Sequence, residues 1–301
     1  MKKKIVITGA TGYIGSHLLK FFLSKGWNVS IIAQSEFGYE NIKDVISEIN
    51  IIEYDNLSKL ISFFQKNDFD VVFHLAAAVI NDYQPKHIST LIQSNIQFGT
   101  EVLEAMKYSN TRLFINTGSY WQNFNSDTYN PVDLYAATKE AFEKIIQYYV
   151  DAHDFRCITL RLFDVYGEDD KRPKLLNLLK KIAETGEMLD VSPGEQYLDM
   201  VHISDVCSAY LRAYELLLAN NDINNNIYGV YSGYRIMLKD VIKLCQTILQ
   251  KPLNINFGGR DYKPREIMMP TMACELLPCW RHKICIEDGL QKILGVKKIV
   301  I

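Results

Sequence analysis

The chain has 301 residues, of which 48% are hydrophobic and 23% are charged, a composition typical of a globular protein with a substantial core. Its net charge of −2 lacks the basic excess expected of a nucleic-acid-binding protein. The apolar run after the basic N-terminus is too short for a signal peptide, and no stretch approaches the roughly 20 apolar residues of a membrane span. We therefore expect a cytoplasmic protein that binds neither membrane nor nucleic acid.

The first half of the chain alternates short apolar runs with helical patterns, which is typical of a parallel sheet covered by helices on both faces. Strands are predicted at residues 4–7, 28–33, 49–54, 71–73, 113–115 and 157–162. Helices are predicted at residues 15–25, 57–66, 88–106 and 135–151. The pattern favours an α/β fold in which residues 1–165 form a Rossmann-type, doubly wound parallel sheet that binds a dinucleotide.

After Gly167 this alternation stops. A charged loop at 168–173 precedes helices predicted at residues 174–184, 205–218, 238–249 and 286–294. The stretch 220–226 is rich in Asn and Asp and is predicted to be a surface loop. We expect residues 166–301 to form mainly a smaller substrate-binding lobe, with some segments returning to the first domain.

The six cysteines include no C-x-x-C pair. Cys274, Cys279 and Cys285 lie near His282, but their spacing matches no standard zinc pattern. We expect free thiols and no metal site.

Residues 8–15 read TGATGYIG and join the first strand to the first helix. Gly9 permits a tight turn, Gly12 lets the backbone approach a pyrophosphate at the helix N-terminus, and Gly15 allows the helix to pack closely on the strand. The sequence therefore predicts a dinucleotide site here. The residues expected to contact the cofactor are Gly9, Thr11, Gly12, Tyr13, Ile14 and Gly15.

The turn and later motifs resemble the extended short-chain dehydrogenase/reductase family, which includes NAD-dependent epimerases and dehydratases. The matching segments are 74–77 (HLAA), Asn95, 161–167 and 194–206, and two family positions differ, with Asp164 replacing Asn and Leu198 replacing Arg. The resemblance implies that further cofactor contacts come from Asp55, Asn56, Leu75, Ala76, Ala77 and Asn95.

Residues 135–139 read YAATK, and on a helix residues four apart share one face. A neighbouring ammonium favours the phenolate of a tyrosine, so Tyr135 beside Lys139 can exchange a proton with a carbonyl or alcohol. The resemblance implies that Lys139 also binds the cofactor ribose. It further implies that Thr117, at the end of the fifth strand, supplies a catalytic hydroxyl, with Ser119 as the alternative.

The same strand end discriminates among reactions. The family's sugar-nucleotide dehydratases carry Thr-Asp-Glu where this chain has Thr117, Gly118 and Ser119, and neither of the last two can act as a carboxylic acid. A closer resemblance, to the 4-ketoreductases that complete deoxyhexose nucleotides for bacterial surface polysaccharides such as lipopolysaccharide, predicts reduction of a 4-keto sugar nucleotide. The alternatives are a nucleotide-sugar 4-epimerase with tightly bound NAD and a non-catalytic dinucleotide sensor.

The remaining expectations concern specificity. Gln34 and Ser35, near the end of the second strand, offer no carboxylate for a ribose 2′-hydroxyl, which favours NADP(H) over NAD(H). Arg260, Lys263 and Arg265 are expected to bind the substrate diphosphate, and Ser119 and Asp164 the sugar. The family's helix pair at 88–106 and 142–150 implies a homodimer.

Overall fold

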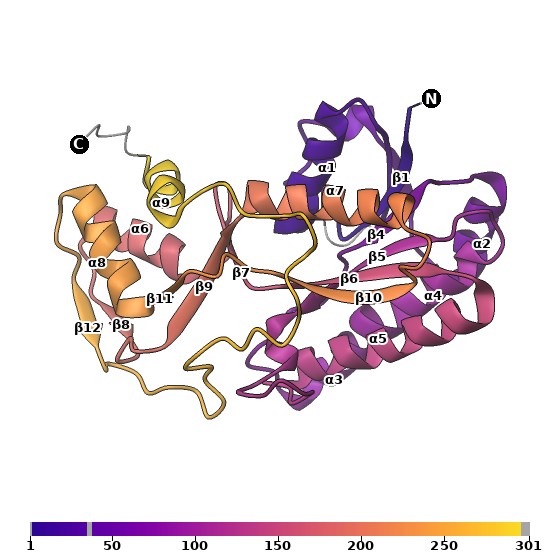
Figure 1. Cartoon of the computed structure of the whole chain (residues 1–301). Coiled ribbons are helices and arrows are strands. Elements are labelled where there is room, and N and C mark those ends of the chain that lie inside the picture. The colour runs from indigo at the N-terminus through magenta and orange to yellow at the C-terminus, as the bar shows by residue number, and fades with distance from the viewer. Residues whose placement is uncertain (1, 35–37, 296–301) are drawn as a thin grey trace.

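A seven-stranded parallel sheet forms the centre of the larger part of the molecule (Figure 1). The computed structural model describes residues 2–34 and 38–295. Read from β3 to β6, the strand order is 3-2-1-4-5-6, that of a doubly wound sheet, and each neighbouring pair is parallel. The predicted Rossmann-type fold is confirmed. The strands are β1 (Lys4–Thr8), β2 (Asn28–Ala33), β3 (Asn50–Glu53), β4 (Val71–His74), β5 (Leu113–Ser119), β6 (Arg156–Leu162) and β10 (Asn225–Val230).

Helices cover both faces of this sheet (Figure 1). On one face lie α1 (Tyr13–Ser24) and α7 (Ile203–Ala219); on the other lie α2 (Leu57–Lys66), α4 (Phe98–Met106) and α5 (Leu134–His153). Side chains alternate along a strand, so Ile5 and Ile7 pack in the first layer and Val6 in the second. Strands buried on both faces explain the continuous apolar runs of the sequence.

The seventh strand, β10, corrects one expectation. Asn225 and Asn226 were predicted to lie in a surface loop, but they begin β10 and pair with Cys157 and Ile158 of β6. Pairing with a distant strand outweighs the weak strand propensity of Asn.

The long helix predicted at 88–106 is divided into three segments. α3 (Ile88–Ile92) continues into a π-helical segment, Gln93–Gln97, before α4. Asn95 lies in the π-helical segment, where its amide bonds both backbone groups of Ala78 and the Thr138 hydroxyl at 2.7–3.0 Å. These contacts tie the helix to the loop after β4 and to α5.

The smaller part of the molecule has its own core. Strands β7 (Asp164–Tyr166), β9 (Tyr197–His202) and β11 (Arg235–Met237) form one sheet, and β8 (Leu189–Val191) pairs with β12 (Ile255–Phe257). Helices α6 (Leu175–Thr185), α8 (Leu238–Leu249) and α9 (Ile286–Leu294) enclose this core. Within the described ranges, no helix combines the length and apolar character that crossing a membrane requires.

A buried cation joins β6 to α5. The Arg161 guanidinium bonds Glu140 at 2.8 Å and Glu143 at 2.7 Å, and it donates to Asn123 at 2.7 Å. The buried Gln122 amide donates to both carboxylates at 2.8 and 2.9 Å. The guanidinium and both carboxylates are at most 11% exposed, so each charge depends on the others for solvation.

We predict that Arg161→Met lowers the free energy of unfolding by about 3–5 kcal/mol, because it leaves two buried carboxylates without their cation. Lys144→Met is the matched control, since Lys144 also pairs with Glu140, at 3.2 Å, but is 76% exposed. Lys144→Met should lower the free energy of unfolding by less than about 1 kcal/mol. Urea unfolding of both variants measures the difference, and equal losses would contradict the prediction.

Candidate active site

The carboxyl ends of β1 and β4 frame a cavity of about 640 Å³. β1 and β4 are neighbouring strands, and the chain after each of them leads to a helix on the opposite face of the sheet. Doubly wound sheets bind ligands at such a point. The lining comes from the glycine-rich turn, the end of β2, the loop after β4 and the helix that follows. The lining residues include Gly9, Thr11, Gly12, Gln34, Tyr54, Leu75, Ala76, Ala77, Gln93 and Phe98.

The glycines of the turn have the geometry that the motif predicts. Gly9 has φ +70°, and a Cβ there would lie 2.6 Å from the Ala76 nitrogen, so the turns after β1 and β4 are in close contact. A Cβ on Gly15 would overlap the Gly9 carbonyl. A Cβ on Gly12 would meet only the Gly9 oxygen, at 3.3 Å, and Gly12 lines the cavity. Gly15 is therefore required for packing, while Gly12 faces the cavity.

Tyr13 and Ile14 begin α1 beside this turn. The Arg172 guanidinium lies 4.5 Å from the centroid of the Tyr13 ring, and Asp170 fixes it through two hydrogen bonds of 2.7 and 2.6 Å. The loop after β7, which the sequence marks only as charged, therefore packs against the first turn of α1.

Two other predicted cofactor residues, Asp55 and Asn56, make contacts outside the cavity. Asp55 forms an ion pair with Lys59 at 2.6 Å, and Asn56 caps α2 by accepting from the Lys59 backbone. Neither lines the cavity, whereas the adjacent Tyr54 does. Ser35 lies outside the described residues.

Sequence reasoning missed the helical side of the cavity. Thr90, Gln93, Ser94 and Gln97 line it from α3 and the π-helical segment. Their spacing of three and four residues is a polar helical stripe that could have been read from the sequence. Asn95 points instead to Ala78 and Thr138.

Helix α5 carries Tyr135 and Lys139. It begins at a cap in which the Asp133 carboxylate accepts from the Ala136 nitrogen at 2.8 Å. Burial raises the pKa of the Tyr135 phenol and Asp133 adds to the rise, whereas a hydrogen bond from Ser119 and the charge of Arg172 oppose it. Burial lowers the pKa of Lys139 to about 8, against the opposing effect of the Glu143 carboxylate.

Lys139 and Glu143 are one turn apart on α5, so the lysine is next to the Arg161 cluster. His74, at the end of β4, is fully buried, and burial followed by the charge of Lys139 lowers the pKa of its ring to about 3. The neutral His74 ring and the Glu143 carboxylate, which also binds Arg161, are therefore the two neighbours that influence the pKa of Lys139 or are influenced by its charge.

The two hydroxyls at the end of β5 have different surroundings. The Thr117 hydroxyl lies 2.8 Å from the His74 carbonyl oxygen and 2.7 Å from the Tyr210 hydroxyl on α7. The Ser119 hydroxyl accepts from the Trp121 nitrogen at 3.3 Å. Both residues lie at the carboxyl end of the strand, where a parallel sheet binds ligands.

A second cavity, of about 530 Å³, lies between the two parts of the molecule and contains the predicted diphosphate-binding cations. Lys263 pairs with Asp82 at 2.9 Å, and the Arg265 guanidinium lies 4.3 Å from the Phe124 ring. Aromatic and aliphatic groups form much of the remaining wall. The lining residues include Tyr83, Tyr120, Trp121, Val132, Asp133, Leu198, Arg260, Lys263, Arg265 and Ile267.

Asp164 lies behind this wall. The Tyr120 hydroxyl is 3.2 Å from each of its carboxylate oxygens. Burial raises the pKa of Asp164 to about 6, although Lys174 and the Tyr120 hydrogen bond lower it. The structure thus connects Asp164 to the second cavity through Tyr120.

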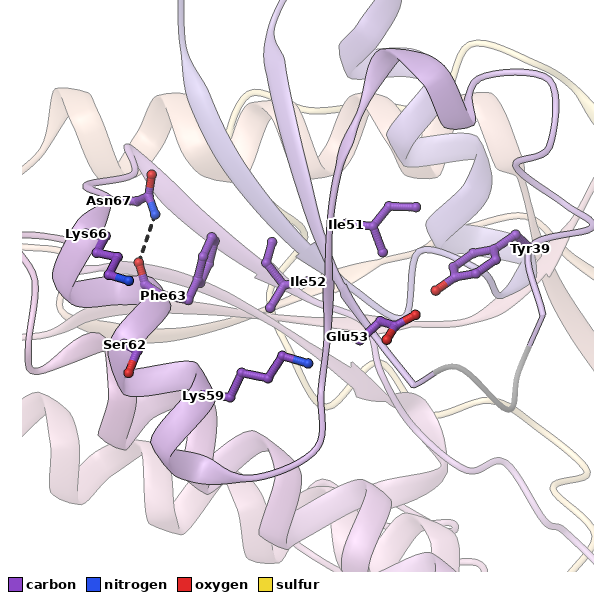
Figure 2. Close-up of a pocket in the computed structure, with 9 residues that line it drawn as sticks. All are labelled: Tyr39, Ile51, Ile52, Glu53, Lys59, Ser62, Phe63, Lys66 and Asn67. Atoms are coloured by element: carbon purple, nitrogen blue, oxygen red, sulfur yellow. Dashed lines mark hydrogen bonds between the residues drawn. The ribbon is translucent and has the colours of Figure 1, made fainter.

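A further hollow, of about 580 Å³, lies at the open edge of β3. Figure 2 shows that it is bounded by Tyr39 on one side and by Lys59 and Phe63 of α2 on the other. It shares no lining residue with the other two cavities, so it is separate from both.

Comparison with known proteins gives consistent results. Residues 5–226 match the model of the "NAD dependent epimerase/dehydratase family". The chain is 28% identical to a CDP-abequose synthase of Salmonella muenchen, with 99% of each chain covered. It is 29% identical to a CDP-abequose synthase of Yersinia pseudotuberculosis, with 98% of this chain and 99% of the relative covered. A UDP-glucuronic acid 4-epimerase of Bacillus cereus, solved with UDP-glucuronic acid and NAD, superposes with a TM-score of 0.83 at 22% identity, covering 97% of this chain and 98% of that one.

We predict that Gly12→Ala and Gly15→Ala separate binding from folding. Gly12→Ala should keep the fold but weaken binding of a dinucleotide by about 10- to 100-fold, because the new methyl group occupies the ligand's side of the turn. Gly15→Ala should destabilise the fold by on the order of 3 kcal/mol or more, because its Cβ meets backbone. Thermal unfolding and titration with NAD and NADP measure the two effects, and a Gly12→Ala protein with unchanged affinity would contradict the assignment of this turn.

Proposed function

The chain belongs to the NAD-dependent epimerase/dehydratase family, and we propose that it reduces the 4-keto group of a nucleotide-activated deoxyhexose. The observation that carries the proposal is the end of β5. It presents hydroxyls and no carboxylic acid beside the helix that bears Tyr135 and Lys139. Tyr135 can deliver a proton to a carbonyl, but this strand end carries no carboxylic acid to assist an elimination.

The cavity framed by β1 and β4 fits a dinucleotide. Its glycine-rich turn opens α1, whose N-terminal N–H groups favour a pyrophosphate, and Lys139 faces the ribose position by resemblance to the family. When bound, the reduced nicotinamide supplies the hydride. Tyr135 donates a proton to the carbonyl oxygen as it becomes an alkoxide, and the Lys139 ammonium stabilises the phenolate that Tyr135 leaves behind.

Gly118 supports reduction over dehydration. A Cβ at this position would lie 2.9 Å from the Arg161 side chain, and 3.0 Å from oxygens of both Gln122 and Glu143. The buried charge cluster therefore fills the space that an acidic side chain at position 118 would need. A carboxylic acid at 118 would need that cluster to move.

The lining of the second cavity favours a substrate in which a deoxyhexose is joined to a nucleoside diphosphate. Arg260, Lys263 and Arg265 supply cations, and Tyr120, Trp121 and Ile267 supply apolar wall. The relatives called CDP-abequose synthase, which align over nearly their whole length, favour the same substrate class. Asp164 accepts a hydrogen bond from Tyr120 and so orients this ring in the wall of the second cavity.

A nucleotide-sugar 4-epimerase remains the second candidate, because structural neighbours at TM-scores near 0.83 carry that name. An epimerase must retain its cofactor through the catalytic cycle, whereas a reductase releases it. A non-catalytic sensor is the third candidate, and it has no use for Tyr135 beside Lys139.

Further parts of the proposal concern the cofactor and assembly. Gln34 lines the cavity and carries no charge that would repel a 2′-phosphate, which favours NADPH as reductant. A structural neighbour, in contrast, is described with NAD. Exposed Ile88 and Ile92 on α3 and Tyr148 on α5 offer an apolar surface for a homodimer. We place the enzyme in the cytoplasm, where nucleotide sugars are made.

We expect the purified protein to carry no bound nicotinamide and to oxidise one NADPH for each 4-keto-6-deoxyhexose nucleotide reduced. Absorbance at the nicotinamide band, with CDP-, dTDP- and UDP-linked substrates and with NADH in parallel, measures this. The same protein incubated with NAD and a 6-hydroxy nucleotide sugar should form no 4-keto-6-deoxy product. Copurified NAD with interconversion of 4-epimers would instead identify an epimerase, and dehydration without added reductant would overturn the proposal.

Tyr135→Phe should lower kcat by about 100-fold or more, because it removes the proton donor, and it should leave cofactor affinity nearly unchanged. Lys139→Met should lower both, because one ammonium serves the tyrosine and the ribose. Steady-state kinetics and NADPH titration distinguish the two variants. Near-normal turnover by Tyr135→Phe would remove this residue from the mechanism.

A further inference from the structure

One end of the cavity framed by β1 and β4 is the place for the adenine of a bound dinucleotide. β2 and β3 lie on one side of the glycine-rich turn after β1, and β4 and β5 lie on the other. α5, which carries Tyr135, packs against β5 and β6. A pyrophosphate at the turn, with its nicotinamide near Tyr135, therefore leaves the adenosine over the ends of β2 and β3. The side chains that line this end are Ile32, Gln34, Tyr54, Gln97 and Phe98.

This end of the cavity has to recognise adenine without a carboxylate. Among the described residues, the lining of the whole cavity carries no charged side chain. Asp55, which the family resemblance assigns to the cofactor, pairs instead with Lys59 at 2.6 Å. The amino group of adenine is a hydrogen-bond donor, and a buried donor needs an acceptor. An uncharged residue must therefore supply that acceptor.

Glu101, in the first turn of α4, fixes two polar side chains at this end. Its carboxylate accepts from the Tyr54 hydroxyl at 2.6 Å and from the Gln97 amide nitrogen at 2.9 Å. A carboxylate can only accept, so the Gln97 amide must turn its nitrogen toward Glu101 and its oxygen away. Within residues 2–34 and 38–295, no group donates to that oxygen. The wall of the cavity thus offers one oriented acceptor.

The Tyr54 ring forms the apolar part of the same wall. Its hydroxyl is held by Glu101, and its backbone nitrogen donates to the Ala33 carbonyl at 2.8 Å. The ring lies 4.8 Å from the Phe98 ring, at an interplanar angle of 66°. Because these contacts fix the ring before a ligand arrives, it presents a preformed surface to a flat heterocycle at a low entropic cost.

We propose that the Gln97 amide oxygen accepts the hydrogen bond of the adenine amino group, with Tyr54 and Glu101 as positioning residues and without Asp55. The inference rests on the dinucleotide site of the proposed function, and not on the sugar reaction. It makes the site selective for a base that carries an amino group at C6. Hypoxanthine has a carbonyl at C6 and would place one acceptor against another.

Titration with NADH, NADPH and their hypoxanthine analogues, followed by the fluorescence of the reduced nicotinamide, tests the proposal without any sugar substrate. The unaltered protein should bind the adenine form about tenfold more tightly than the hypoxanthine form, because the hypoxanthine form leaves two acceptors facing each other. Gln97→Leu should bring this ratio to within about twofold of one. Asp55→Asn is the matched control and should leave the ratio as it is in the unaltered protein.

Two further variants separate a specific contact from a general loss of the site. Gln97→Lys can only donate, so it should reverse the preference and favour hypoxanthine. Glu101→Gln should lower the ratio although Gln97 is unchanged, because an amide at 101 can donate as well as accept and lets the Gln97 amide turn over. Gln97 is exposed, so its replacements should fold, and thermal unfolding checks this.

Equal binding of the two bases by the unaltered protein would overturn the inference and leave the proposed function standing. A ratio that is kept in Gln97→Leu, or lost in Asp55→Asn, would also overturn it, since another residue would then bind the amino group. Selective binding of the adenine dinucleotide without reduction of any 4-keto nucleotide would support the inference and defeat only the proposed function. Binding of neither dinucleotide would overturn both.

Discussion

The arrangement of the active site depends on one buried guanidinium. Arg161 lies near the carboxyl end of β6 and binds Glu140 and Glu143 of α5. Gln122 closes the cluster from the turn after β5. Removing one partner of a buried ion pair is strongly destabilising. These contacts therefore fix the rotation of α5 about its axis relative to β5 and β6. Tyr135 and Lys139 lie on the preceding turns of that helix, and their direction is fixed with it.

The cluster also limits the chemistry that this sheet can support. It packs against Gly118, so the residue between the two β5 hydroxyls has no side chain to contribute. The same contacts that stabilise the helix therefore exclude an additional acid from the strand end. One shared volume therefore links the stability of the helix to the absence of a side chain at position 118.

Local pattern was enough to predict most of the fold. Apolar runs, helical spacing and the turn at 8–15 each act within a few residues, so β1, α1 and α5 could be located from the sequence. The features that escaped prediction depend on partners far along the chain. β10 exists because β6 offers an edge, and the π-helical segment follows from the Asn95 contacts with Ala78 and Thr138.

The candidate site divides in the same way. The glycine motif and the Tyr135–Lys139 spacing are local and could be found directly. Counting along a motif cannot show that the Thr117 hydroxyl contacts Tyr210, because Tyr210 is more than ninety residues from Thr117. Asp55 is a different case, because its partner Lys59 is only four residues away and the spacing of this ion pair is visible in the sequence.

The position of β10 late in the sequence has a consequence for folding during synthesis. This strand follows α7, yet it completes the sheet on the outer side of β6. Until it docks, the nascent chain presents the backbone of β6 as an open edge, which is a template for intermolecular pairing. The Rossmann half is therefore not an autonomous unit that finishes folding as it leaves the ribosome. The seven-stranded sheet is complete only after β10, which follows the first strand of the smaller lobe, has been synthesised. Nascent chains that end before β10 should therefore need chaperone protection.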